Sequence, residues 1–236
     1  MKNLIAILPI KEHSERLPGK NFLELGGKPL FHWVCNAILE LRANGLDQLI
    51  ITTDCPERFK DYFIKTNKDC SGSLIIHPRP DCLRGDHVNM NMVIADVVTE
   101  YPAEAYFQTH ATSPFITAQD FEQAYRYLLD PEQGFDSVCS MSMLHQRAYY
   151  NGAPVNFNPS NNANDTTRLQ PIIYENGAFY FFKRESFFRY GARKCGNVGI
   201  KVLDHITGLD IDTKTDWTIA EGLASWKPER KIQLKK

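Results

Sequence analysis

Short apolar runs rich in β-branched residues alternate with helical stretches along the first 140 residues. The strand-like runs are residues 4–8, 49–51, 73–76, 105–108 and 136–140, and the helical stretches are residues 30–43, 56–66, 87–100 and 117–129. A repeat of this kind is typical of a mostly parallel sheet with helices on both faces. The pattern therefore predicts an α/β fold.

Residue types at the ends of two stretches support the helical interpretation. Pro29 suits the first turn of the helix at 30–43, and Gly45 suits its end. Thr117 and Asp120 are spaced as a capping box for the helix that runs to about residue 129. Local signals and apolar periodicity thus predict the same elements.

The pattern changes between about residues 141 and 175. Residues 151–167 are rich in Asn, Pro and Gly and have almost no apolar period. Two interpretations stay open, namely a disordered segment or an arm that packs on a partner subunit. Regular structure is expected again as a strand at 178–182, a short helix at 185–190, a strand around 200–209 and a helix at 214–225.

Composition limits the class of protein. The chain has 236 residues, of which 43% are hydrophobic and 23% charged, so residues 1–236 suit a single large domain with an excursion at about 141–175. The net charge of −1 lacks the basic excess of a nucleic-acid binder. No apolar run reaches the length of a membrane span, and the N-terminus lacks the features of a signal peptide. Six cysteines without a C-x-x-C pair favour reduced thiols in a cytoplasmic protein over a zinc site or a disulfide framework.

The segment LPIKEHSERLPGKN, residues 8–21, follows the first predicted strand and is here named the opening loop. It carries Lys11, Arg16 and Lys20 and is braced by two prolines. Ligands in open α/β sheets bind beyond the carboxyl ends of the strands, where this loop is expected. Neither a Walker A motif nor G-x-G-x-x-G is present. The loop is either a solvated charged turn or a site for a triphosphate.

A pair of aspartates, Asp210 and Asp212, stands near the end of the chain. In an extended segment, residues two apart point the same way, so both carboxylates would lie on one face. Two hard oxygen ligands beside phosphate suit Mg²⁺. The alternative is that Asp212 or Thr213 caps the last helix, with Asp216 completing a capping box.

Two further loops follow predicted strands. Arg79 stands between two prolines in His-Pro-Arg-Pro and is either held to read a base or exposed in a rigid turn. His110, Thr112 and Ser113 belong to His-Ala-Thr-Ser-Pro, whose small hydroxyl residues suit either a tight site wall or the entry of a helix.

Together these motifs resemble the acylneuraminate cytidylyltransferases, which make CMP-activated sialic acids and related nonulosonic acids and have the KDO cytidylyltransferases as relatives. The resemblance runs in order through nearly the whole chain. It is carried by Lys11…Ser14…Arg16-Leu-Pro-Gly-Lys20-Asn21, Leu25-Gly-Gly-Lys-Pro-Leu, Thr52-Thr-Asp54, Arg79-Pro80, His110-Ala-Thr-Ser-Pro, Asn176-Gly-Ala and Asp210-Ile-Asp212-Thr.

The resemblance implies a Rossmann-like sheet of the nucleotide-diphospho-sugar transferase type, and a homodimer paired through residues 141–175. It also implies roles for single residues. Lys11, Ser14, Arg16 and Lys20 would line the CTP triphosphate, Asn21 would position the nucleotide, Arg79 would contact cytosine, His110 and Asn176-Gly177 would face the sugar, and Asp210 and Asp212 would hold Mg²⁺.

The sequence departs from the family pattern at several of these positions. Lys11 replaces a usual arginine and loses its bidentate fork, and Glu15 replaces a usual lysine. His110 stands where glutamine is usual, and Tyr174-Glu175 precede Asn176 where arginine is common, so Arg168 could supply that charge. The departures bear on the acceptor more than on cytidylyl transfer.

The resulting hypothesis is Mg²⁺-dependent attack of a sugar-acid hydroxyl on CTP, with Lys20, Arg16 and Lys11 as catalytic cations. His110, Thr112, Ser113, Arg168, Tyr174, Asn176 and Gly177 are the predicted acceptor-binding residues. One alternative is a nucleotidyltransferase for a sugar or polyol phosphate, for which His110, Arg147 and Arg168 could bind the phosphate. Another is a non-catalytic nucleotide-binding homologue, which Glu15 and Lys11 would favour.

Overall fold

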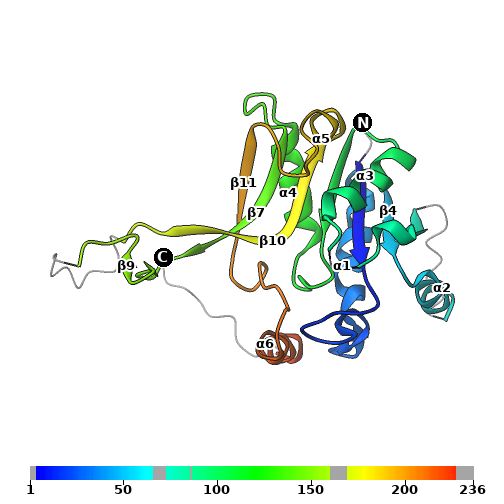
Figure 1. Cartoon of the computed structure of the whole chain (residues 1–236), viewed down its shortest axis with the longest axis horizontal. Helices are drawn as coiled ribbons and strands as arrows, with labels where there is room; N and C mark the ends of the chain where they lie inside the picture. The colour runs from blue at the N-terminus through cyan, green and yellow to red at the C-terminus, as the bar shows by residue number, and fades with distance from the viewer. Residues whose placement is uncertain (1–3, 66–72, 86, 160–168, 227–236) are drawn as a thin grey trace.

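A seven-stranded sheet forms the centre of this computed structural model, which describes residues 4–65, 73–85, 87–159 and 169–226 (Figure 1). The strand order is β11-β7-β10-β6-β1-β4-β5. The strands are β1 (Leu4–Ile10), β4 (Leu46–Thr53), β5 (Leu74–Pro78), β6 (Ala105–Thr109), β7 (Ser137–Leu144), β10 (Ile172–Lys183) and β11 (Val198–Leu203). Only β10 runs antiparallel to its neighbours β6 and β7, so the predicted mostly parallel sheet is confirmed.

Helices cover both faces of this sheet, as predicted. They are α1 (Leu30–Glu40), α2 (Pro56–Lys65), α3 (Met90–Glu100), α4 (Ala118–Leu129), α5 (Arg184–Tyr190) and α6 (Lys214–Ser225). Alternate residues of β1 enter different cores, because side chains alternate along a strand. Leu4 and Ala6 pack with α1, α2 and α4, while Ile5 and Ile7 pack with α3 and α5. None of the described helices is long and apolar enough to cross a bilayer.

The chain between β11 and α6 differs from the prediction. The expected strand around 200–209 ends at Leu203, and the next residues form a turn. The Asp204 carboxylate causes this end, because it accepts the backbone N–H groups of Ile206 and Thr207 at 2.8 and 3.0 Å. Asp210 and Asp212 therefore lie in a loop and not on a strand.

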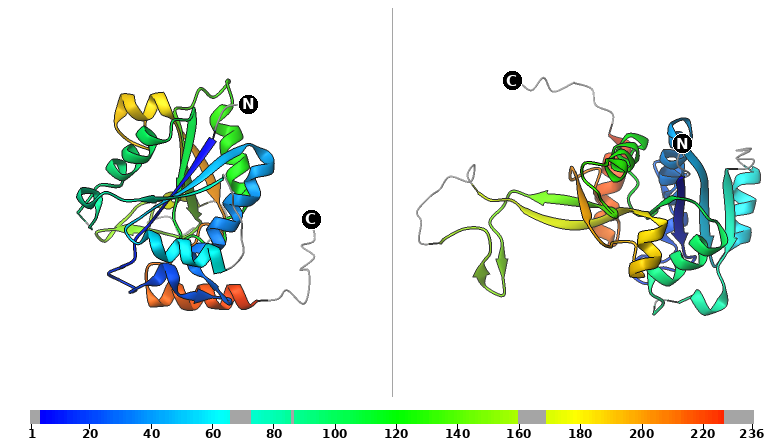
Figure 2. Two further views of the ribbon diagram at one scale, coloured as in Figure 1. Left: turned by 90° about the vertical axis from the view of Figure 1, so that its right-hand side faces the viewer. Right: turned by 90° about the horizontal axis from the view of Figure 1, so that it is seen from above.

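The described parts of residues 141–175 form an arm that extends away from the sheet (Figures 1 and 2). The ends of β7 and β10 pair in it, with Ile172 opposite Leu144 and Glu175 opposite Met141. A hairpin of β8 (Tyr149–Tyr150) and β9 (Ala153–Pro154) follows. These residues are ordered by strand pairing, which favours the arm over a disordered segment. Residues 160–168 of this segment lie outside the described residues.

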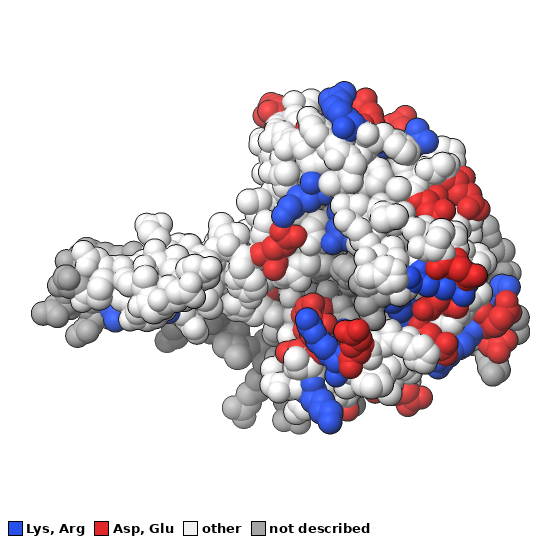
Figure 3. All heavy atoms as spheres, in the orientation of Figure 1, with Lys and Arg blue, Asp and Glu red and all other residues white. Residues whose placement is uncertain are grey.

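The surface of the arm carries large apolar side chains. Tyr149 and Tyr150 are 61% and 74% exposed, and Val155 and Ile173 are also exposed. Figure 3 shows few charged side chains on the visible face of the arm. Such a surface is compatible with a protein partner, but pairing of two subunits through it stays a prediction.

Candidate active site

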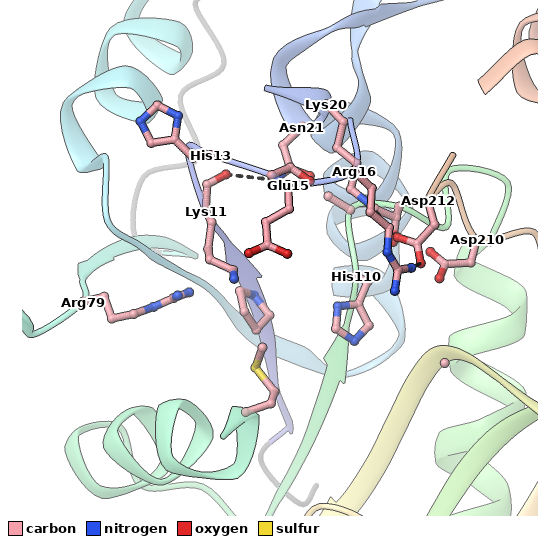
Figure 4. A pocket seen from close by; sticks show the side chains of 16 residues that line it. Lys11, His13, Glu15, Arg16, Lys20, Asn21, Arg79, His110, Asp210 and Asp212 are labelled. Carbon is pink, nitrogen blue, oxygen red and sulfur yellow. Dashed lines mark hydrogen bonds and ion pairs between the residues drawn. The ribbon is translucent and has the colours of Figure 1, made fainter. Parts of the chain in front are cut away.

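A cavity of about 430 Å³ opens at the carboxyl ends of the central strands (Figure 4). The chain passes from β1 to β4 and β5 on one side and returns to β6 on the other side of β1. This is the topological switch point at which open α/β sheets bind ligands. The cavity is lined by Pro9, Lys11, His13, Ser14, Glu15, Arg16, Lys20, Asn21, Arg79, Met90, His110, Ala111, Thr112, Gly177, Asp210 and Asp212.

The opening loop is held in place by bonds from both of its ends. The backbone N–H of Glu12 donates to Asp54 Oδ1 at 2.9 Å, and the Glu12 carboxylate accepts from Arg58 at 3.0 Å. The Asn21 amide donates to the carbonyl of Lys11 at 2.9 Å, which joins the end of the loop to its beginning. The loop is therefore anchored to the body and is not a freely solvated turn.

Two cations of the opening loop meet Asp212, which is far away in the sequence. Lys20 Nζ lies 2.8 Å from Asp212 Oδ1 and donates to the Ile211 carbonyl at 2.7 Å. Arg16 Nη1 lies 2.5 Å from Asp212 Oδ2. The hydrogen bond from Lys20 is the main cause that lowers the pKa of Asp212. The structure thus brings together the predicted phosphate-binding loop and a predicted metal ligand.

Packing explains why these distant segments meet. A small apolar core contains Leu17 of the opening loop, Leu25 just after it, Leu30 of α1, Ile211 before α6 and Ala220 within α6. Ile211 is fully buried, so its neighbours Asp210 and Asp212 are held at the edge of that core. The Ile211 N–H also donates to the Thr112 carbonyl at 2.9 Å. The loop between β11 and α6 is therefore fixed against both the opening loop and the segment after β6.

The cap of α6 separates the roles of the last three aspartates. Thr213 is the N-cap, and it forms a capping box with Asp216, so the predicted helix-capping role of Asp216 is confirmed. Asp212 lies before the cap and faces the cavity, so it is not the helix cap that the sequence allowed. Burial and the charge of Asp212 raise the pKa of Asp210, while a hydrogen bond from Thr112 opposes that shift.

The two carboxylates form an incomplete cation site. Among the described residues, no group of three or more His, Cys, Asp or Glu side chains is placed to hold a metal ion. Asp210 and Asp212 both line the cavity, and the charge of Asp212 raises the pKa of Asp210. Mg²⁺ commonly takes one or two carboxylates and completes its shell with phosphate oxygens and water. The residues present therefore fit Mg²⁺ only together with a phosphate-bearing ligand.

Arg79 lies at the other end of the cavity from the two aspartates (Figure 4). It is 2% exposed, and its Nη2 donates to the Thr52 carbonyl at 3.0 Å. Burial lowers the pKa of its guanidinium, and its Nε has no hydrogen-bond partner. The exposed turn that the sequence allowed is therefore wrong, because the arginine is buried and held against the cavity.

Three of the predicted acceptor residues line the cavity, namely His110, Thr112 and Gly177. Burial, with the charges of Arg193 and Lys20, lowers the pKa of His110 to about 4. Gly177 reaches the wall because β10 shifts its register against β7 between Glu175 and Tyr180, and Gly177 has a φ of 73° there. Such irregularities often shape the rims of active sites.

The other predicted acceptor residues lie elsewhere. Ser113 is buried behind the wall, and Tyr174 is 43% exposed at the base of the arm. The Asn176 amide donates to Ser142 Oγ at 2.9 Å and braces the bend in β10. Arg168 lies outside the described residues. Arg147, the other candidate for an acceptor phosphate, stacks over Phe157 on the arm at 5.3 Å.

Sequence reasoning missed some of the residues that line the cavity. Met90 lines the cavity and is the first residue of α3, which begins three residues later than the predicted start at residue 87. The helix begins there because the side chain of Asn89 caps it. Helices that follow parallel strands begin at the same edge of the sheet as the ligand site. Glu15, which the resemblance places among the triphosphate positions in place of a usual lysine, does project into the cavity (Figure 4).

Comparisons with known sequences identify a family that matches the chain. The cytidylyltransferase family profile matches residues 5–234. The chain is 24% identical over 225 residues to N-acylneuraminate cytidylyltransferase B of Danio rerio, covering 92% of this chain and 50% of that protein. It is 24% identical over 231 residues to the pseudaminic acid cytidylyltransferase of Campylobacter jejuni, covering 94% of this chain and 95% of that protein. The chain spans about half the length of the first curated relatives that it matches.

Solved structures share the fold at low sequence identity. The CMP:2-keto-3-deoxy-manno-octonic acid synthetase complexed with CTP superimposes with a TM-score of 0.68 at 18% identity, covering 94% of this chain and 98% of that one. The 4-diphosphocytidyl-2C-methyl-D-erythritol synthase of Anaerococcus prevotii gives a TM-score of 0.61 at 12% identity, covering 94% and 98%. With the match over residues 5–234, the chain belongs to the cytidylyltransferase family.

Proposed function

We propose that the protein is a Mg²⁺-dependent cytidylyltransferase that couples CTP to a nonulosonic, sialic-acid-like sugar acid and releases pyrophosphate. The observation that carries this proposal is the contact of Lys20 and Arg16 with Asp212, beside Asp210, in the cavity at the switch point. The names of the similar acylneuraminate and pseudaminic acid enzymes supply the acceptor class.

The two ends of the cavity suggest how CTP would bind. Arg79 lies at one end, and the aspartates lie at the other (Figure 4). The cytosine would lie against Arg79, whose unpartnered Nε can donate to a base oxygen or nitrogen. The triphosphate would extend along Lys11, Ser14 and Arg16 toward Lys20. In this orientation the α-phosphate lies next to the least exposed lysine of the site.

Asp210 and Asp212 would hold Mg²⁺ together with phosphate oxygens of CTP. The charge of Asp212 disfavours the ionised form of Asp210, and a bound cation would offset that repulsion. When bound, the ion would offset the negative charge of the phosphates. Lys20 and Arg16, which contact Asp212 in this structure, would then turn toward the phosphate oxygens.

The reaction is transfer of a cytidylyl group. A hydroxyl of the acceptor loses its proton to solvent as its oxygen forms a bond to the α-phosphorus, the bond from that phosphorus to the bridging oxygen breaks, and pyrophosphate leaves. Negative charge increases on the transferring phosphoryl group and on the leaving group. Lys20, Lys11 and Arg16 are placed along the cavity to stabilise that charge, and a fixed loop spares the cost of ordering them during the reaction.

We also propose a cytoplasmic homodimer paired through the arm. The exposed apolar side chains of the arm, among them Tyr149 and Tyr150, support pairing. Five cysteines in the described part of the chain are free thiols, as expected in a reducing compartment.

The test is pyrophosphate release from CTP and Mg²⁺ across a panel of acceptors. The panel contains N-acetylneuraminate, other nonulosonic acids, KDO and several sugar phosphates, with ATP, GTP and UTP as controls. Release with CTP and one sugar acid is the expected result. Release only with a phosphorylated acceptor, or only with another nucleotide, would contradict the proposal.

A further inference from the structure

Arg193 lies in the loop between α5 and β11 and was not singled out by any motif. The loop is fixed at both ends. Gly191, with a φ of 70°, ends α5, and the Cys195 N–H donates to Ser137 Oγ at 2.9 Å. The Arg193 N–H donates to Asn91 Oδ1 at 3.3 Å, in the first turn of α3. Because Met90 of that turn lines the cavity, Arg193 is held beside the cavity wall.

The side chain of Arg193 extends toward β10. Its guanidinium carbon lies 4.1 Å from the centre of the Tyr180 ring, a cation–π contact. The Tyr180 hydroxyl lies next to Gly177, since a Cβ at that glycine would be 3.9 Å from it. The positive charge of Arg193 is close enough to lower the pKa of His110. Arg193 thus lies just behind the part of the wall formed by Met90, His110 and Gly177.

Arg193 forms no ion pair with a carboxylate of the described chain, although the charge of Glu175 and the Tyr180 hydroxyl both act on its guanidinium. The nearest candidate, Glu175, already accepts from Lys194 Nζ and from the Tyr180 hydroxyl, each at 2.5 Å. Among the described residues no carboxylate lies within ion-pair distance of the Arg193 guanidinium, and its buried Nη1 has no hydrogen-bond partner. Burial lowers the pKa of this arginine. A buried donor without a partner is costly, so such a site favours an anionic ligand.

The other arginines considered for the site are paired or lie elsewhere. Arg16 is paired with Asp212, and Arg79 lies at the opposite end of the cavity. Arg147 is on the arm, stacked over Phe157. An acceptor whose hydroxyl reaches the α-phosphate beside Lys20 would extend past His110 and Gly177, toward Arg193.

We propose that Arg193 binds the anionic group of the acceptor and so selects sugar acids over uncharged sugars. The inference rests on the proposed function, under which that group is the acceptor carboxylate. A planar guanidinium suits this role because it can donate two parallel hydrogen bonds to a carboxylate.

The experiment compares Arg193→Met with Arg189→Met, which removes an exposed arginine of α5 four residues earlier. Methionine keeps an apolar stem against Tyr180 and removes the charge. The acceptor is supplied both as the free acid and as its carboxamide. Arg193→Met should raise the KM for the acid about 10- to 100-fold, as expected for loss of a hydrogen-bonded charge. The KM for CTP, and turnover of the carboxamide, should match the wild type, and Arg189→Met should change neither KM. Arg193→Lys should recover part of the loss.

The outcomes separate this inference from the proposed function. If the wild-type protein uses a sugar acid but Arg193→Met affects acid and carboxamide equally, or affects neither, the inference is wrong and the proposed function stands. If the wild-type protein uses only a phosphorylated acceptor, the proposed function is wrong. In that case the KM of Arg193→Met, Arg189→Met and Arg193→Lys is measured for the phosphorylated acceptor and for the same acceptor without its phosphate. The inference about Arg193 is wrong if Arg193→Met changes both KM values equally or changes neither. If the wild-type protein turns over no acceptor, and calorimetry with CTP-loaded protein detects no binding of an anionic acceptor, both the proposed function and the inference about Arg193 are overturned. If Arg193→Met strongly lowers the melting temperature, the same comparison of KM for the acid and for the carboxamide is made with Arg193→Lys and Arg193→Gln instead.

Discussion

The Lys20 end of the cavity and the Arg193 region behind its wall are built in different ways. At the Lys20 end, Lys20 and Arg16 already pair with Asp212, which lies 192 and 196 residues further along the chain. In the Arg193 region, Glu175 is used by Lys194 and Tyr180, and the guanidinium keeps a buried donor without a partner. The Lys20 end is assembled by contacts within the chain and would have to exchange partners when a nucleotide binds. The Arg193 region keeps hydrogen-bonding capacity that contacts within the described chain do not use.

The largest effect is expected from Lys20→Ala. Lys20 has a side chain only 10% exposed and bonds to both Asp212 and the Ile211 carbonyl, so no mobile surface lysine can replace it. Loss of one such cation should lower kcat about 10²- to 10³-fold, measured by pyrophosphate release. Lys60→Ala, which removes an exposed lysine of α2, is the matched control and should keep full activity. Full activity in Lys20→Ala would refute the catalytic role of the opening loop.

A somewhat smaller loss is expected from Asp210→Asn. The amide keeps the shape of the side chain but removes the negative charge that would hold Mg²⁺, so turnover should fall about 10²-fold, as for loss of a comparable electrostatic contact. Higher Mg²⁺ should restore part of the turnover, and EDTA should abolish turnover of the wild-type protein. Asp81→Asn, at a highly exposed aspartate, serves as control. An Asp210→Asn protein with wild-type turnover and an unchanged Mg²⁺ requirement would exclude the metal role.

Two matched helix caps test whether the pairing at the Lys20 end depends on α6. Thr213 and Thr117 each cap a helix through a capping box with an aspartate. Each change to alanine should cost about 1 kcal/mol in the free energy of unfolding, measured by urea denaturation. Only Thr213→Ala should also raise the KM for CTP, because Asp212 precedes this cap. If the KM for CTP is the same in Thr213→Ala and Thr117→Ala, Asp212 is held independently of α6.

The smallest effect concerns His110, which lines the cavity. Its pKa in the folded protein is lowered to about 4, below the ordinary value of 6.5, so the folded state keeps the ring neutral. Between these values the unfolded chain binds more protons, and stability must fall as pH falls from 6.5 toward 4. His110→Gln should reduce this acid sensitivity, read as the difference in melting temperature between pH 7 and pH 5. His205→Gln, at an exposed histidine, should leave it unchanged.

The comparison of the Lys20 end with the Arg193 region also shows where sequence reasoning succeeds. The opening loop, Arg79 and the two aspartates come directly after strands or before a helix, and all of them line the cavity. Their motifs are local, so order along the chain was enough to propose a shared site. Arg193 has no such signal, because its importance comes from Tyr180, Asn91 and Glu175, which are distant in sequence.

By itself the sequence determined the mostly parallel α/β sheet, the helices on both faces, the capping box at Thr117, the capping role of Asp216 and the family. These depend on apolar period, β-branching and neighbouring side chains, which are readable in short windows. Only the tertiary structure decided that Asp212 pairs with Lys20 and Arg16, that β11 ends at Leu203, and that Gly177 enters the cavity through a shifted register of β10. The physical reason is that ion pairs, strand register and burial depend on which distant segments pack together, as Ile211 does with Leu17 and Leu25.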